Sequence, residues 1–261
     1  MIKLFRKTRQ RLLTENKFTK YLLYAAGEII LVVVGILIAL SINNSNEDKK
    51  TRRQEVKYLK NLQTDIGLEI INNDSLINYR AFTAKAAARI LDFKTLESVN
   101  DIMALEQNVN QVFSRETFIP TNNTFKELLS SGNLSYITND SIKDYLLELD
   151  KMYVSIGNGE HHMYREYEEY LYNVSIKNGP VLNLLDVQKI AATGLFHFAD
   201  PLQIPVETVL SDYNRLLKKH EFRNGLKLSV MNNIGLKNIH GVMTQHLKKL
   251  NELIKNDLEN N

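Results

Sequence analysis

The stretch "KYLLYAAGEIILVVVGILIALSINNSNEDKKTRR", residues 20–53, decides the fold. Residues 21–42 form an apolar run of 22 residues in which Glu28 is the only charged side chain. An α-helix of that length spans roughly 33 Å, close to the ~30 Å hydrocarbon core of a bilayer. Because lipid offers no partners for backbone polar groups, a spanning segment must be helical. The run therefore predicts a transmembrane helix over residues 21–42.

The charges before this run predict its orientation. Residues 1–20 carry seven Lys and Arg side chains against Glu15, a net charge of +6. Such a leader resists translocation, so we expect a basic cytoplasmic leader over residues 1–20. The far flank is basic too, but long domains translocate largely regardless of charge. The predicted location is the inner membrane, single-pass, with the N-terminus cytoplasmic and residues 43–261 periplasmic.

Two alternatives to a spanning helix remain open at this point. The run could be a cleaved signal peptide, because Ala39-Leu40-Ser41 resembles a small-x-small cleavage site. It could also be the core helix of a soluble protein. The long basic leader and the carboxylate of Glu28 argue against cleavage, and nothing else in the chain is equally apolar.

The lone carboxylate suggests a contact face within the membrane. At about 100° per residue, Gly35 and Ala39 each lie within roughly 20° of the direction of Glu28 on the helix. Small residues four apart allow helices to approach closely in lipid, and an intramembrane carboxylate needs a partner. We therefore predict a helix–helix contact through these three residues, with a second copy or another membrane helix. The alternative is a shallow carboxylate that reaches the lipid headgroups.

The remainder of the chain has a composition typical of a helical domain. The whole chain has 33 Lys and Arg against 30 Asp and Glu, and the leader's net charge of +6 is larger than this whole excess. Residues 43–261 carry 26 basic and 28 acidic groups, which argues against nucleic-acid binding. There is no Cys, so disulfides and Cys-ligated metals are excluded. Four Pro and eleven Gly favour long helices.

A helix-period stripe follows the membrane segment and predicts a long stalk-like helix over residues 43–95. Apolar residues recur there at three- and four-residue steps. Asn73 and Arg80 interrupt the pattern, so a continuous coiled coil is not expected. The expected inner face comprises Leu59, Leu62, Ile66, Ile70, Asn73, Ile77, Ala81, Ala84, Ala88 and Leu91.

Three more helices are expected next in the chain, and their ends are recognisable. Residues 98–114 should form a helix whose inner face is Ile102, Leu105, Val109 and Val112. Asn123 or Thr124 should cap a second helix that ends at Gly132. Asn139 or Thr138 should cap the next, which carries Ile142, Tyr145, Leu146 and Leu149.

The C-terminal third combines an irregular part with further helices. Residues 173–205 hold three of the four prolines and few periodic apolar residues, which predicts an irregular excursion. Helices are then expected over residues 206–220, 221–233 and 236–258. The overall prediction is a mainly α protein: one transmembrane helix and a helical-bundle soluble domain.

The polar segment "GNGEHHMYREYEEYLY", residues 157–172, holds the candidate metal ligands. His162 and Glu166 stand four apart on one helical face, a spacing that metal sites use. No third ligand is identifiable, so a charged outer face with inward tyrosines is the favoured interpretation. No cofactor is predicted.

Two segments resemble a known family. "FRKTRQRLLTENKFTKYLLYAAGEIILVVVGILIALSINNSNEDKK" (5–50) is similar to the opening of a family of uncharacterised bacterial single-pass membrane proteins, a domain of unknown function. Its members share a Gly-Glu-Ile entry, a Gly-Ile-Leu-Ile-Ala-Leu exit and an Asn-Asn end to the membrane segment. Ser45 stands where the family usually has Trp. "TFKELLSSGNLSYITNDSIKDYLLELD" (124–150) resembles its soluble segment. The resemblance implies location and architecture, but no activity.

Two classes of function fit these features. The favoured one is a membrane-anchored extracytoplasmic binding or protein-interaction module, whose partners are membrane lipid and a second copy or another membrane helix. The alternative is a membrane-tethered enzyme with a site in the 157–205 region. A polar pocket gathering Glu160, His161, His162 and Glu166 would support the enzyme.

Overall fold

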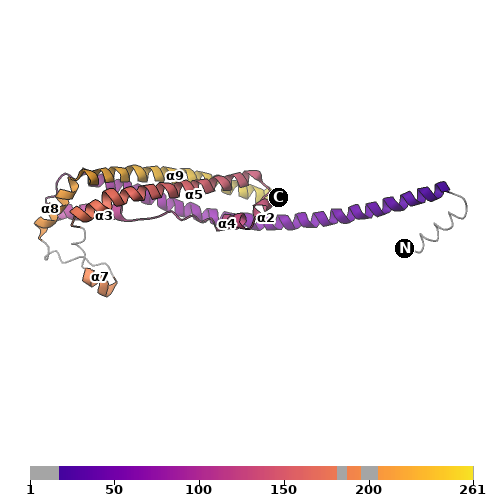
Figure 1. Ribbon diagram of the computed structural model, residues 1–261, viewed down its shortest axis with the longest axis horizontal. Coiled ribbons are helices and arrows are strands. Elements are labelled where there is room, and N and C mark those ends of the chain that lie inside the picture. Colours follow the sequence, from indigo (N-terminus) through magenta and orange to yellow (C-terminus); the bar gives the residue numbers. More distant parts are fainter. Residues whose placement is uncertain (1–17, 181–186, 195–204, 261) are drawn as a thin grey trace. The chain divides into compact units, whose positions relative to one another are not determined.

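In a computed structural model of the chain, residues 18–180, 187–194 and 205–260 are described, and all regular structure in these ranges is helical. The predicted mainly α fold is therefore confirmed. The elements, labelled as in Figure 1, are α2 (Phe18–Asp92), α3 (Val99–Phe113), α4 (Asn123–Ser130), the 3₁₀ turn η1 (Asn133–Tyr136), α5 (Asp140–Glu166), the π-helix η2 (Tyr167–Tyr172), α6 (Asn173–Asn178), α7 (Val187–Thr193), α8 (Val206–Leu217) and α9 (His220–Asn260).

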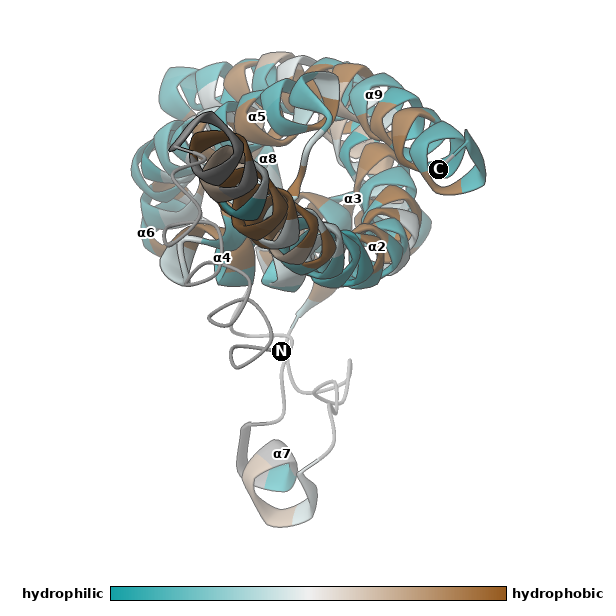
Figure 2. Cartoon of the chain, turned by 90° about the vertical axis from the view of Figure 1, so that its right-hand side faces the viewer, coloured by the Kyte–Doolittle hydropathy of each residue, from teal (hydrophilic) through white to brown (hydrophobic). Residues whose placement is uncertain are grey.

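The chain divides into two compact units, Met1–Lys57 and Tyr58–Asn261. In the first unit α2 is long and apolar enough to cross a membrane, and none of that apolar window is buried. Leu31, for example, is 69% exposed. Figure 2 shows this apolar part of α2 in brown. Such a surface is stable in water only when something apolar covers it, which is the role of lipid in a spanning helix.

In the second unit α5 and α9 lie side by side (Figure 1), and residues 58–92 of α2 pack with them. α2 and α9 are antiparallel, because Asn73 contacts His240 while Arg223 donates to the carbonyl of Leu91. Two separate apolar cores result. One includes Leu62, Phe125, Leu146, Ile156 and Leu250, and the other includes Ile90, Leu105, Leu171, Tyr213 and Phe222.

The buried seam of α2 differs from the predicted stripe. The buried positions follow a strict three–four alternation, which is a heptad pattern with a period near 3.5 residues. After Ile66 the prediction is confirmed at Asn73 and Ala84, which are buried. Elsewhere it lies one position off the seam; Ala88, for example, is exposed while Ala87 is buried. The observed seam is Leu59, Leu62, Ile66, Glu69, Asn73, Leu76, Arg80, Thr83, Ala87 and Ile90.

Several predicted helix ends are confirmed. The four predicted inner residues of α3 are all buried. Gly132 ends α4 with φ +71°, the left-handed conformation that favours glycine. The Asn139 side chain accepts a hydrogen bond from the backbone N–H of Ile142, 3.3 Å away, and caps α5. The predicted cap of α4 was wrong, because Asn123 and Thr124 lie inside the helix and Asn122 precedes it.

The C-terminal third is more helical than predicted. α6 and α7 lie within the range 173–205 that was expected to be irregular, while residues 181–186 and 195–204 of that range lie outside the described residues. Residues 221–233 and 236–258 belong to one continuous helix, α9, so the predicted break at Gly235 was wrong. α8 ends at Leu217, and His220 begins α9 instead of ending the previous helix.

Candidate functional site

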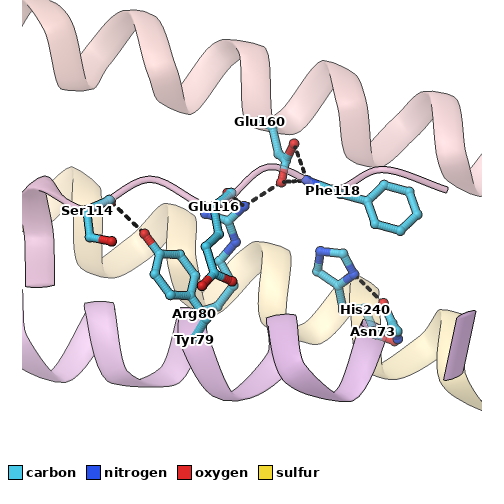
Figure 3. A network of polar contacts seen from close by, with 8 residues as sticks. All are labelled: Asn73, Tyr79, Arg80, Ser114, Glu116, Phe118, Glu160 and His240. Carbon is cyan, nitrogen blue, oxygen red and sulfur yellow. Dashed lines mark hydrogen bonds and ion pairs between the residues drawn. The ribbon is translucent and has the colours of Figure 1, made fainter. Parts of the chain in front are cut away.

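A buried ion pair joins α2 to α5 between the two apolar cores (Figure 3). Arg80 is 2% exposed and donates to the carboxylate of Glu160, which is 9% exposed. The same Arg80 nitrogen, Nη2, donates to the backbone carbonyl of Glu116 at 3.0 Å. Glu160 also accepts from the backbone N–H of Phe118 at 3.1 and 3.2 Å. Separating the two side chains would leave a buried charge unpaired, which is strongly destabilising. The ion pair therefore holds both side chains in position.

A second buried polar group lies one heptad away on α2. The Asn73 amide donates to the carbonyl of His240 at 2.7 Å and to the hydroxyl of Thr244 at 2.5 Å. Asn73 Oδ1 therefore accepts from His240 Nδ1, at 2.5 Å, which assigns the imidazole proton to Nδ1. Burial, with the nearby charge of Arg80 as the smaller cause, lowers the pKa of His240 to about 4. The imidazole is thus neutral at physiological pH.

Carboxylates of α2 also hold the irregular connection between α3 and α4 and the first turn of α4. Glu69 accepts from the backbone N–H of Thr121 at 2.6 Å, and Asp65 accepts from that of Thr124 at 2.8 Å. Burial raises the pKa of Glu69, although the Thr121 N–H opposes this shift. An irregular segment beside a core needs such partners, because its backbone groups lack a helical ladder.

A cavity of about 260 Å³ opens beside the Arg80–Glu160 pair. Its walls come from α2, the connection after α3, α5, η2 and α9. Apolar, aromatic, polar and charged side chains all contribute to the lining. The residues that line the cavity include Tyr79, Arg80, Val112, Arg115, Glu116, Gly157, Glu160, His161, Met163, Tyr164, Glu166, Tyr167, Leu171, Leu228, Ser229, Asn232 and Asn233.

The π-helix shapes this cavity. η2 supplies Tyr167 and Leu171 to the wall. π-helical segments are rare and occur frequently at functional sites. α9 approaches η2 so closely that a Cβ at Gly225 would lie 2.9 Å from the Cβ of Tyr170 and 2.9 Å from Leu171 Cδ2. Only glycine fits there without displacing η2.

Two residues of the cavity lining each carry a buried polar atom that has no hydrogen-bond partner among the described residues. Asn233 is 3% exposed, and its amide donates to the Ser229 carbonyl at 2.8 Å, which leaves Oδ1 unpaired. Arg80 Nε is likewise unpaired. Leaving such a group unsatisfied costs about 1–3 kcal/mol. At the edge of the cavity, the guanidinium of Arg115 stacks 3.6 Å from the ring centre of Tyr164.

Three of the four residues of the predicted polar pocket lie at the cavity. Glu160, His161 and Glu166 line the cavity, whereas His162 pairs with Glu166, their Nε2 and Oε1 atoms being 3.1 Å apart. The interpretation of this segment as a charged outer face was wrong for Glu160, which is buried. Among the described residues no group of three His, Asp or Glu side chains could hold a metal ion.

The predicted membrane residues all lie on α2. Glu28, Gly35 and Ala39 are exposed there, and no atom lies within 4 Å of a Cβ placed at Gly35. Glu28 has no hydrogen-bond partner among the residues that the structure describes. Their contact with another helix stays a prediction.

Comparison with known proteins places the chain in a family. The profile of a family of unknown function (DUF6090) matches residues 28–201, two thirds of the chain. The chain belongs to this family. No curated protein and no solved structure matches it. The matched range of DUF6090 includes Arg80, Arg115 and Glu160, whereas Asn233 and His240 on α9 lie beyond it.

Sequence reasoning missed most of this site. It noted Arg80 and Asn73 only as interruptions of an apolar stripe, and it did not single out Arg115 or Asn233. A signal was present: α2 keeps its heptad spacing through polar residues, and α5 carries Gly157 and Gly159 in mid-helix. Polar residues at a heptad seam indicate a buried network, and a mid-helix glycine indicates a steric need.

Proposed function

We propose that this DUF6090 protein is a membrane-anchored binding module whose helical domain holds a small molecule in the cavity between α2, α5, η2 and α9. The observation that carries the proposal is the cavity itself, whose lining combines apolar and aromatic residues with a few polar and charged ones. Ligand sites are concave and largely apolar, with few convergent polar groups. At about 260 Å³ the cavity suits a ligand smaller than a typical drug.

Gly157 supports this assignment. It lies inside the 27-residue helix α5, where glycine is roughly 0.5–1 kcal/mol less favourable than alanine. Its neighbour Gly159 has a packing reason, since a Cβ there would lie 3.1 Å from Leu236 Cδ2. Gly157 has none, because nothing lies within 4 Å of its Cβ position, and it lines the cavity. A glycine that stability does not require keeps this wall open.

The experiment compares two leucine substitutions in the full chain extracted in detergent. Gly157→Leu adds a side chain at an exposed position of the cavity lining, whereas Gly67→Leu is the matched control at an exposed position of α2 away from the cavity, again with nothing within 4 Å. Both variants should gain helix stability. Small molecules released from the denatured proteins are identified by mass spectrometry.

The expected result is a compound retained by the parent and by Gly67→Leu but depleted at least about tenfold in Gly157→Leu, since about 1.4 kcal/mol of lost binding suffices. Equal recovery from all three proteins, or no retained compound, would contradict a ligand site in this cavity.

Binding is favoured over catalysis because Glu160 is already committed. Its carboxylate accepts from Arg80 and from the backbone of Phe118, so it serves as a fixed anchor instead of a mobile base. The membrane-tethered enzyme with a site at 157–205 gains part of its expected pocket, because Glu160, His161 and Glu166 line the cavity, but His162 does not and instead pairs with Glu166.

We further propose that α2 spans the bacterial inner membrane with residues 1–20 in the cytoplasm and residues 43–261 in the periplasm. The cationic leader and the exposed apolar surface of α2 support this topology. A C-terminal alkaline phosphatase fusion should be active, and a cytoplasmic reporter fused there should be the active one if the orientation is reversed. N-terminal sequencing of the membrane-extracted protein tests retention of the anchor: a chain that starts near Ile42 would indicate a cleaved signal.

A further inference from the structure

The guanidinium of Arg115 lies at the edge of the cavity. Arg115 is exposed, and its guanidinium carbon lies 3.6 Å from the ring centre of Tyr164, which also lines the cavity. A guanidinium is planar and carries its five N–H donors in that plane, so a ring against its face holds it without using a donor. Among the described residues, no acceptor and no carboxylate contacts the Arg115 side chain. Its donors can therefore be reached and used by a ligand.

Two hydrogen bonds hold the backbone on either side of Arg115. The Tyr79 hydroxyl donates to the carbonyl of Ser114 at 2.6 Å (Figure 3), and Arg80 Nη2 donates to the carbonyl of Glu116 at 3.0 Å. With its neighbours anchored and its side chain stacked on a ring, Arg115 has little freedom left to lose when a ligand binds. Such preorganisation favours binding because it lowers the entropy cost of association.

Two of the three carboxylates that the described residues contribute to the lining are paired. Glu160 belongs to the buried ion pair, and Glu166 Oε1 lies 3.1 Å from Nε2 of His162. The side chain of the third, Glu116, extends from the connection toward α2 in Figure 3, whereas the Arg115 guanidinium lies on a ring of α5. The guanidinium is thus a charged group of the lining that is fixed in place while its donors stay unused.

One face of α5 leads from this guanidinium along the cavity. Gly157, His161 and Tyr164 follow at steps of four and three residues, so they share a helical face, and all three line the cavity. The His161 ring has no hydrogen-bond partner among the described residues, and an imidazole offers an N–H donor in either tautomer. Apolar side chains such as Met163 and Leu171 line the same cavity. Donors for an anion and apolar surface for the body of a ligand therefore occur together.

We infer that the cavity binds a small organic carboxylate with an apolar body, whose carboxylate group accepts hydrogen bonds from the guanidinium of Arg115 at the cavity edge. A carboxylate matches the fork of guanidinium donors through two parallel hydrogen bonds. The apolar and aromatic lining covers the body of the ligand. The inference rests on the proposed function of the cavity and adds the chemical class of the ligand.

Three probes of similar shape test this class on the full chain extracted in a non-ionic detergent. They are 3-phenylpropionate, the uncharged 3-phenylpropanamide and the cation 3-phenylpropylammonium, with Kd measured by titration calorimetry at neutral pH and low salt. The carboxylate should bind about five- to tenfold more tightly than the amide, because charge-assisted hydrogen bonds are roughly twice as strong as neutral ones. The ammonium should bind more weakly than the amide. Added salt should reduce the advantage of the carboxylate, because Arg115 is exposed and salt screens exposed charges.

Variants assign the preference to one side chain and separate it from partitioning into detergent. Arg115→Met keeps a long side chain beside Tyr164 without the charge, so it should abolish the difference between carboxylate and amide. Arg115→Lys keeps the charge but loses the fork of donors, so it should retain only part of the difference. Arg89→Met, at an exposed position of α2 outside the cavity lining, is the matched control and should leave every Kd unchanged.

Several outcomes overturn the inference. They are an amide or ammonium probe that binds as tightly as the carboxylate, an Arg115→Met protein that keeps the parent's preference, and a parent that binds no probe saturably. Gly157→Leu should weaken the binding of all three probes, and Gly67→Leu should not. Probes that bind equally well but lose affinity in Gly157→Leu would disprove the carboxylate class and leave the proposed function in place. Probes that bind Gly157→Leu as tightly as the parent would contradict both.

Discussion

Two regions of this molecule place a carboxylate among apolar residues, and they treat it differently. Between the two cores of the helical domain, Glu160 is buried and accepts from Arg80 and from the backbone of Phe118. On the apolar part of α2, Glu28 is exposed and has no hydrogen-bond partner among the described residues. The first carboxylate is satisfied within the chain, so it contributes to the fold. The second has no such partner among the described residues, and its contact with another helix stays a prediction.

The largest expected effect breaks the internal pair. Arg80→Met leaves Glu160 charged, buried and without its ion-pair partner, and should lower the free energy of unfolding by about 3–5 kcal/mol. Arg80→Met combined with Glu160→Leu removes both charges and should recover most of that loss. Urea unfolding of the detergent-extracted protein, followed by circular dichroism, measures both. A double variant no more stable than Arg80→Met would show that the pair is not the source of the effect.

A second test concerns the neighbouring polar group, His240. Its pKa is lowered to about 4 in the folded protein from an ordinary value of 6.5, so between these pH values the unfolded chain binds more protons. The free energy of unfolding should therefore fall as the pH is lowered from 6.5 to 4, by up to about 3 kcal/mol. The contribution of the neutral His240 to the free energy of unfolding should be fully present above pH 6.5.

His240→Gln provides the control, because glutamine cannot take up that proton. Subtracting its pH profile from that of the parent isolates His240 from other titrating groups such as Glu69. Parallel profiles of the parent and His240→Gln over this range would contradict the assignment.

The difference between the two carboxylates also explains what the sequence could reveal. Glu28 stands out because the residues around it form one uninterrupted apolar run, and a spanning helix must be continuous along the chain. Glu160 is surrounded by polar residues in sequence and becomes buried only when α2 and α9 lie against α5. Helix type and several helix ends are local, so they were predictable. The seam, the cavity and the π-helix depend on which helices meet.

α9 illustrates the same limit in the fold. The expected helices ended at residue 233 and resumed at 236, but this gap, which includes Gly235, lies inside a 41-residue helix. Tertiary packing on both sides of it outweighs a local penalty of roughly 1 kcal/mol. Gly225, which no sequence pattern distinguished, is the glycine that packing requires.

A third test uses that glycine to disturb the cavity wall without touching its polar groups. Gly225→Ala places a methyl group 2.9 Å from Tyr170 and Leu171, so η2 must move. Overpacking of this kind typically costs about 1–3 kcal/mol, and the unfolding midpoint should fall accordingly. Gly241→Ala, also in α9 but with open space around its Cβ, should be neutral or slightly stabilising. Equal midpoints for both variants would mean that η2 adapts freely.

The smallest expected effect concerns Glu28 and decides whether its partner is another helix. A charged side chain at the centre of a spanning helix costs roughly 2.5–3.5 kcal/mol on insertion scales, and the off-centre position of Glu28 should cost less. A neighbouring helix could offset that cost by hydrogen bonding. Such bonds average only about 0.6 kcal/mol in membranes, so close approach at Gly35 and Ala39 must contribute as well.

We therefore expect Gly35→Ile to weaken self-association more than Glu28→Gln, whose amide still forms hydrogen bonds. Leu37→Ile, which lies off this face, should have no effect. Energy transfer between labelled copies in vesicles measures all three. If the parent shows no association, or if all three variants associate as the parent does, Glu28 is satisfied by lipid headgroups, and the membrane segment acts as an anchor alone.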